Sequence, residues 1–138
     1  MAKNTQMSNL AVNTEADALA ALANGGKLCI FDGVQPATAN TNITTQVMLG
    51  RVTMGNPAFA AAVNGVLTAN TMTGDVALNE GVAAWFRLYA SNGTTVLWDG
   101  SVGTSDANLI MPSLVILADY QVGVATFTHT VSKSWSGH

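Results

Sequence analysis

The residues that could carry out chemistry are few, and their spacing brings hardly any of them together. His129 lies in an alternating run and His138 is the final residue, and neither has a cysteine or carboxylate close by in the sequence. Metal sites are built from clusters of such ligands, so the sequence predicts no metal site and an ordinary strand position for His129. Cys29 is the single cysteine and lies in an apolar run, which predicts a small buried side chain. Pairing between subunits and a reactive thiol are the alternatives.

The carboxylates are dispersed as well. Asp75 and Glu80 share one polar stretch, and Asp99 and Asp106 bound another. General acid–base catalysis needs carboxylates that converge in a pocket, and a calcium loop needs more oxygen ligands than the second stretch offers. The sequence contains no nucleophile elbow, phosphate-binding glycine loop or zinc pattern. It therefore predicts a protein that is not an enzyme and that takes no cofactor.

One pattern does gather aromatic side chains. Asn92-Gly93 between two apolar runs predicts a hairpin with a two-residue type I′ turn, because both central positions of that turn need positive φ. Such a turn would set Arg87 opposite Trp98, so that Trp85, Arg87, Tyr89 and Trp98 share one face. One interpretation of this face is a cation–π pair that braces the sheet. The other is a partner-facing patch, since Trp, Tyr and Arg are enriched at interface hot spots.

The elements that must position these residues are one helix and several strands. Asn13-Thr14 before an alanine-rich run and Gly25-Gly26 after it predict a helix over 14–24, with Leu19, Leu22 and Ala23 in its apolar stripe. The predicted strands are Lys27–Phe31, Gln46–Met54, Ala60–Val63, Val66–Ala69, Gly81–Ala90, Thr95–Trp98, Asn108–Leu117 and Val122–Val131. A second Asn-Gly dipeptide at 64–65 predicts another type I′ hairpin.

Short strands with regular turns predict an all-β fold, an antiparallel β-sandwich of the jelly-roll-like kind with one short N-terminal α-helix. We expect an N-terminal arm over 1–12, a single domain over 13–132 and a C-terminal tail over 133–138. The tail contains Trp135, a large aromatic among polar residues, which predicts an anchor on a neighbouring subunit. Both termini resting on their own domain is the alternative.

Composition bears on the partners. Only 13 of the 138 residues are Asp, Glu, Lys or Arg, which is 9%, while 49% are hydrophobic. An ordinary soluble domain has about 25% charged residues, so this chain lacks the charged surface that keeps a free monomer dispersed. The net charge is −3 and the basic residues are scattered, which argues against nucleic acid as a partner. No run is long and apolar enough to predict a membrane span, and no apolar signal core precedes the domain.

Two groups of segments resemble a known family. The first is Leu28–Asn40 followed by Thr44–Leu49 and Gly55–Phe59, and the second is Ala83–Tyr89 followed by Asp99–Gly103. In this order they resemble small structural proteins encoded among the virion genes of tailed bacteriophages. The resemblance rests on turn and core residues, so it implies a virion component and transfers no catalytic or binding residue.

Within that class the resemblance favours a capsid decoration (cement) protein on the outer surface of the head, made in the host cytoplasm. A tail, collar or neck protein is the alternative. The partners would be other copies of this chain, with a trimer expected by analogy, and the major capsid protein or tail and neck proteins. A carbohydrate-binding β-sandwich is a different class, and Trp85, Trp98 and Trp135 would then stack on sugars.

Overall fold

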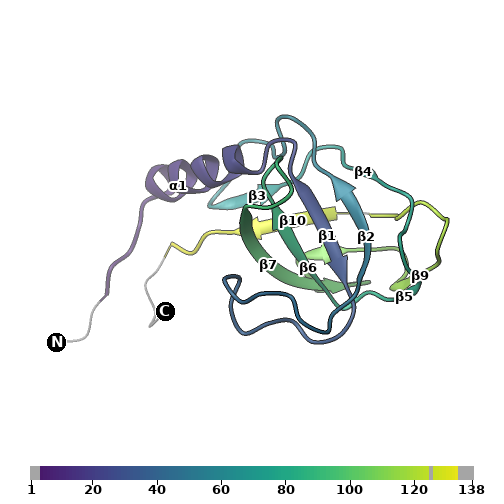
Figure 1. The fold of residues 1–138 in the computed structure, drawn as a ribbon. Helices are drawn as coiled ribbons and strands as arrows, with labels where there is room; N and C mark the ends of the chain where they lie inside the picture. The colour runs from purple at the N-terminus through teal and green to yellow at the C-terminus, as the bar shows by residue number, and fades with distance from the viewer. Residues whose placement is uncertain (1–3, 125, 134–138) are drawn as a thin grey trace.

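The computed structural model describes residues 4–124 and 126–133, and these form a mostly β structure with one helix (Figure 1). The helix, α1, spans Asn9–Leu22. Its N-cap is Ser8, whose Oγ accepts a hydrogen bond from the Ala11 amide at 3.1 Å. The predicted helix was therefore right in kind but began too late, and part of the predicted arm is helical. Thr14, part of the expected cap, instead donates its hydroxyl proton to the Leu10 carbonyl inside the helix.

The buried side of α1 also differs from the predicted stripe. Val12 and Ala16 are the buried residues of the helix, and Ala23 at its C-cap is buried as predicted, while Leu22 is exposed. The earlier start explains the difference, because it adds Val12 one turn before Ala16 on the same face. Small side chains on that face let α1 approach the sheet closely.

Eight strands form one curled, mixed sheet in the order β3-β10-β8-β7-β6-β1-β2-β4. Every pair is antiparallel except β7–β8, which is parallel. The strands of this sheet are β1 Lys27–Phe31, β2 Met48–Thr53, β3 Val66–Thr68, β4 Thr73–Gly74, β6 Trp85–Tyr89, β7 Val96–Gly103, β8 Leu109–Ile110 and β10 Thr126–Thr130. The sheet makes a half-barrel, so the predicted antiparallel sandwich is not confirmed.

The second sheet has only two short strands, β5 Gly81–Val82 and β9 Val115–Ile116. Each is a piece of a longer predicted strand. Pro112 interrupts the run that becomes β8 and β9, since proline cannot donate to a strand ladder. Ala83 likewise separates β5 from β6, and its amide hydrogen-bonds to the Leu114 carbonyl at 2.8 Å. The chain thus leaves the large sheet twice at the same end of the molecule.

The core fills the inside of the curl. Phe86 and Phe127 meet edge to face there, with ring centroids 5.1 Å apart and planes at 81°. Gly100 on β7 lies against the Phe86 ring so closely that a Cβ would come within 2.5 Å of its atoms. Only glycine leaves room for that ring, so β7 depends on it at this point.

The two Asn-Gly hairpins differ. At 64–65 both residues have positive φ, 51° and 79°, and Val63 and Val66 exchange two backbone hydrogen bonds, which confirms the type I′ turn. At Asn92-Gly93 a hairpin forms as predicted, but its loop is longer. The Ala90 amide donates to the Thr95 carbonyl, and the Asn92 side chain accepts amide hydrogen bonds from Thr94 and Thr95.

Next to the loop the register is the predicted one, with Tyr89 opposite Val96, and it changes at a bulge further along the ladder. Arg87 pairs with Asp99 and Leu88 with Trp98, and the register shifts between Leu88 and Tyr89. The predicted pairing of Arg87 with Trp98 is therefore wrong. A slip of one residue moves a side chain to the other face of a sheet, so Trp98 lies on the core side instead of beside Arg87.

Candidate interaction surface

The face predicted to carry an aromatic patch is covered by the protein itself. Trp85 and Arg87 are 1% and 2% exposed. The Trp85 ring stacks on Phe31 with 4.7 Å between centroids, and its Nε1 donates a hydrogen bond to the Asp32 carbonyl at 3.0 Å. The Arg87 guanidinium carbon lies 5.5 Å from the centroid of the Trp85 ring. These contacts form the cation–π brace, and they leave neither side chain available to a partner.

A network of hydrogen bonds fixes Arg87 beneath a loop of its own chain. Arg87 Nε donates to Asp99 Oδ1 at 2.6 Å, and Nη2 donates to Oδ2 at 2.9 Å. The carbonyls of Thr41 and Thr38, in the loop 32–47 between β1 and β2, accept at 2.8 and 3.5 Å. Hydrogen bonding to Asp99 raises the pKa of Arg87, so the guanidinium stays charged. We call Trp85, Arg87 and the loop 32–47 over them the covered face.

Trp98 lies on the other side of the sheet. Its ring stacks on His129 with 4.5 Å between centroids and packs near Phe127 at 6.4 Å. Burial lowers the pKa of His129, so this imidazole is neutral near pH 7. Neither Trp85, which is buried, nor Trp98, which is stacked and half-buried, offers a free ring on which a sugar could lie. Trp135 lies outside the described residues.

Tyr89 is half-buried and lines a hollow of about 280 Å³ together with Lys27, Cys29 and Arg51. Cys29 is 6% exposed, which confirms a buried thiol. Burial raises its pKa to about 11, against the opposing effect of Arg51. The thiol is therefore protonated at neutral pH and is a weak nucleophile. Arg51 forms an exposed ion pair with Asp75 at 3.0 Å.

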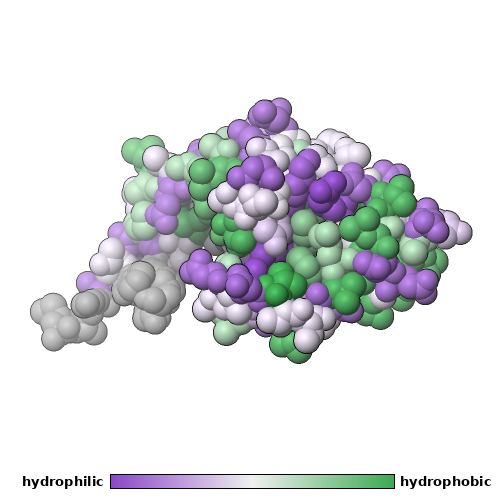
Figure 2. All heavy atoms as spheres, in the orientation of Figure 1, coloured by the Kyte–Doolittle hydropathy of each residue, from purple (hydrophilic) through white to green (hydrophobic). Residues whose placement is uncertain are grey.

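The main group of exposed apolar side chains lies elsewhere, around β5 and β9. Figure 2 shows apolar residues exposed at the end of the molecule that carries these strands in Figure 1. Six of the eleven large apolar side chains that are exposed in the described part of the chain belong to it, each 52–68% exposed: Val76, Leu78, Val82, Val115, Leu117 and Tyr120. We call these six residues the β5–β9 end.

Backbone pairing holds these side chains together. Val82 is directly opposite Val115 in the β5–β9 ladder, and the Ala77 amide donates to the Tyr120 carbonyl at 2.8 Å. Monomeric soluble proteins rarely expose a contiguous apolar patch of more than a few hundred Å². An exposed group of this kind is typical of a protein–protein contact. A surface of aliphatic side chains and one tyrosine would bind a partner through buried apolar area and complementary shape.

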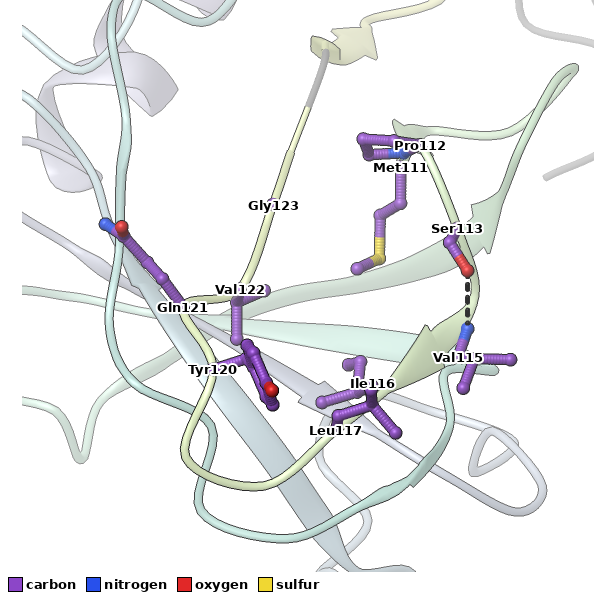
Figure 3. Close-up of a pocket in the computed structure, with 10 residues that line it drawn as sticks. All are labelled: Met111, Pro112, Ser113, Val115, Ile116, Leu117, Tyr120, Gln121, Val122 and Gly123. Carbon is purple, nitrogen blue, oxygen red and sulfur yellow. Dashed lines mark hydrogen bonds between the residues drawn. The ribbon is translucent and has the colours of Figure 1, made fainter.

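The same end is hollowed. A concavity of about 280 Å³ is lined by residues 111–113, 115–117 and 120–123. Figure 3 shows the side chains of Met111, Ile116, Tyr120 and Val122 around this space, with the Val115 amide hydrogen-bonded to Ser113 Oγ at 3.1 Å. The lining is mostly apolar, so the hollow suits an aliphatic side chain of a partner.

The charged side chains within the segments of this end have one sign, while the exposed Arg51–Asp75 pair lies next to Val76. Glu80 and Asp119 are exposed there, and the segments 76–82 and 109–123 contain no lysine or arginine. The β5–β9 end is thus an apolar surface with an acidic rim. Sequence reasoning missed it, although a signal was present. Val76-Ala77-Leu78 and Val115-Ile116-Leu117 are apolar at consecutive positions, so that one neighbour is buried while the next remains outside.

Other kinds of site are not seen in the described residues. No group of three or more His, Cys, Asp or Glu side chains in residues 4–124 and 126–133 is arranged to hold a metal ion. No helix in the same part of the chain is long and apolar enough to cross a bilayer. Comparison of the chain with protein-family models, with curated proteins and with solved structures found no match.

Proposed function

We propose that this protein is a structural component of a tailed-bacteriophage virion and that it decorates the outer surface of the head. The observation that carries the proposal is the β5–β9 end, an uncovered apolar surface on a chain in which only 13 of 138 residues are charged. Such a surface in water is an aggregation liability, and it is stabilised when another protein covers it. The resemblance to small virion proteins is the reason why we propose a phage particle as the assembly in which this surface is covered.

The chemistry of the molecule supports a binding role of this kind. A decoration protein acts by adding buried area between subunits of the head, and it needs no reactive group for this. The major capsid protein would be its partner, contacted through aliphatic side chains and the hollow beside β9. The net charge of −3 suits a location away from packaged DNA, because like charges repel.

Labelling of particles tests the proposal. Particles purified from the phage that encodes this chain are labelled with gold-conjugated antibody against the protein and viewed by electron microscopy. We expect label spread over the head surface. Label confined to the tail or neck would move the protein to those structures, and particles that carry no label anywhere would overturn the virion assignment.

A pair of variants tests whether the β5–β9 end makes the contact. Leu117→Asp places a charge within this surface, on a side chain that is 52% exposed, and should lower occupancy on heads by at least about tenfold. Thr94→Asp adds the same charge at the exposed β6–β7 loop and should leave occupancy unchanged. Equal occupancy of the two variants, both with unaltered melting temperature, would exclude this surface as the contact.

A further inference from the structure

The described residues nearest the two termini form the opposite end of the molecule. In Figure 1 residues 4–10 and 131–133 lie far from β5 and β9. The Met7 amide donates to the Lys133 carbonyl at 2.7 Å, which joins the two segments. Leu10 is 78% exposed in the first turn of α1, and Lys133 is exposed in the other segment. We call residues 4–10 and 131–133 the terminal end.

The terminal end complements the β5–β9 end in charge. It carries the exposed Lys133. The nearest acidic residues on α1, Glu15 and Asp17, are five and seven positions beyond Leu10, about 7–10 Å along the helix axis. An exposed leucine with a cation therefore stands at one end of the molecule, and an apolar hollow with an acidic rim stands at the other.

A symmetric contact of the β5–β9 end with itself is disfavoured by the same charges. In a two-fold interface a surface meets its own copy, so Glu80 and Asp119 would meet carboxylates across the contact. Like charges placed together at an interface cost free energy, and no lysine or arginine in segments 76–82 and 109–123 offsets them. A second copy that approaches with its terminal end meets no such penalty.

We propose that the β5–β9 end of one copy binds the terminal end of a second copy, so that copies associate head to tail. Leu10 of the second copy would cover the apolar side chains beside the hollow, and Lys133 would face Glu80 and Asp119. The contact is heterologous, because the two copies use different surfaces, and it repeats until it closes into a ring. It rests on the proposed structural role and deepens it by naming another copy of the chain as a partner. Both contacts use the β5–β9 end, so the second copy and the capsid protein compete for it, and association of copies is tested away from particles.

Two variants that each disable one half of the contact provide the test. Leu117→Asp disables the β5–β9 end and keeps the terminal end. Leu10→Asp disables the terminal end and keeps the β5–β9 end, and it should not harm α1, since an acidic residue in the first turn favours a helix. In sedimentation velocity without particles, we expect the wild type to associate beyond a dimer as its concentration rises, and each variant alone to remain monomeric.

The decisive measurement is the mixture of the two variants. The intact terminal end of the Leu117→Asp protein can bind the intact β5–β9 end of the Leu10→Asp protein, so the mixture should form one-to-one dimers and stop there. A mixture that stays monomeric while the wild type associates would overturn the head-to-tail contact. Leu10→Asp protein that still dimerises alone would show a symmetric contact and overturn it too.

Two controls separate the possible failures. Thr94→Asp should associate as the wild type does, and all variants should keep the wild-type melting temperature within about 2–4 °C. Glu80→Lys should weaken association. When Glu80→Lys protein is mixed with Lys133→Glu protein, the opposite charges face each other again, and association should be at least about tenfold tighter than for either variant alone. A wild type that is monomeric at millimolar concentration yet labels phage heads would overturn this contact and leave the virion role standing.

Discussion

The covered face and the β5–β9 end treat apolar surface in opposite ways. On the covered face the loop 32–47 lies over Trp85 and Arg87 and satisfies the guanidinium with its own carbonyl groups. At the β5–β9 end six aliphatic or aromatic side chains stand more than half exposed, and no loop of the described chain lies over them. Residue type alone therefore did not identify the surface that is open to a partner. Trp and Arg are common at hot spots, yet here they brace the interior.

We expect the largest difference in stability between removing a buried ion pair and removing an exposed one. Asp99→Ala should lower the free energy of unfolding by about 3–5 kcal/mol, because it leaves Arg87 buried without its carboxylate. Asp75→Ala, which removes the exposed pair with Arg51, should cost less than about 1 kcal/mol. Urea denaturation of both variants measures the difference. Similar losses would mean that the loop does not seal the covered face.

The buried thiol beside the covered face should make stability depend on pH. The pKa of Cys29 is raised from its ordinary value of 9.0 to about 11, so folding keeps a proton that the unfolded chain releases. The contribution of the protonated thiol to the free energy of unfolding is fully present below pH 9. It is lost as pH rises to 11, which lowers the free energy of unfolding by about 2–3 kcal/mol. Denaturation midpoints at pH 8, 9, 10 and 11 measure it. Cys29→Ala should lack this part of the slope, and an unchanged slope would contradict the assignment.

The next largest effect should be the difference in stability loss when an apolar side chain is truncated on the covered face and at the β5–β9 end. Ile43, in the loop 32–47, packs against the cluster of Cys29, Phe31 and Trp85, so Ile43→Ala should cost about 1–2 kcal/mol. Leu117→Ala at the β5–β9 end should change stability by no more than about 0.5 kcal/mol, because that side chain meets mostly water in the monomer. Thermal unfolding at low concentration compares them. A larger loss for Leu117→Ala would show that the end is already covered by another copy.

The smallest effect should come from His129 on the core side of the sheet. Burial depresses its folded pKa below the ordinary value of 6.5, so its contribution to stability is present above pH 6.5 and is lost as pH falls through the folded value. His129→Phe should keep the stack on Trp98 and remove this acid dependence. Trp98 fluorescence followed during denaturation at pH 7 and pH 5 reports both. An acid response that survives in His129→Phe would place its source elsewhere.

Much of the fold followed from local patterns. Strand Lys27–Phe31 forms with its predicted bounds, both Asn-Gly hairpins exist, and glycines at 25–26 follow the helix. What local patterns misjudged were boundaries and register. Ser8 caps α1 several residues before the predicted start, and a bulge in the β6–β7 ladder between Val96 and Trp98 shifts Trp98 to the core side. A one-residue bulge inside a strand is nearly invisible in sequence, yet it reverses which face a side chain occupies.

The amino-acid sequence by itself determined the strand-rich character, the single helix, the low charge and the buried cysteine, because propensity, turn chemistry and composition act over a few residues. Only the tertiary structure decided which apolar residues are inside. Trp85 is buried because the loop 32–47 after its neighbouring strand β1 folds back over it, as the hydrogen bond of Trp85 to the Asp32 carbonyl and the packing of Ile43 show. Val115 is exposed because nothing in the described chain returns over β9. Covering depends on where distant segments lie, and local sequence does not encode that position.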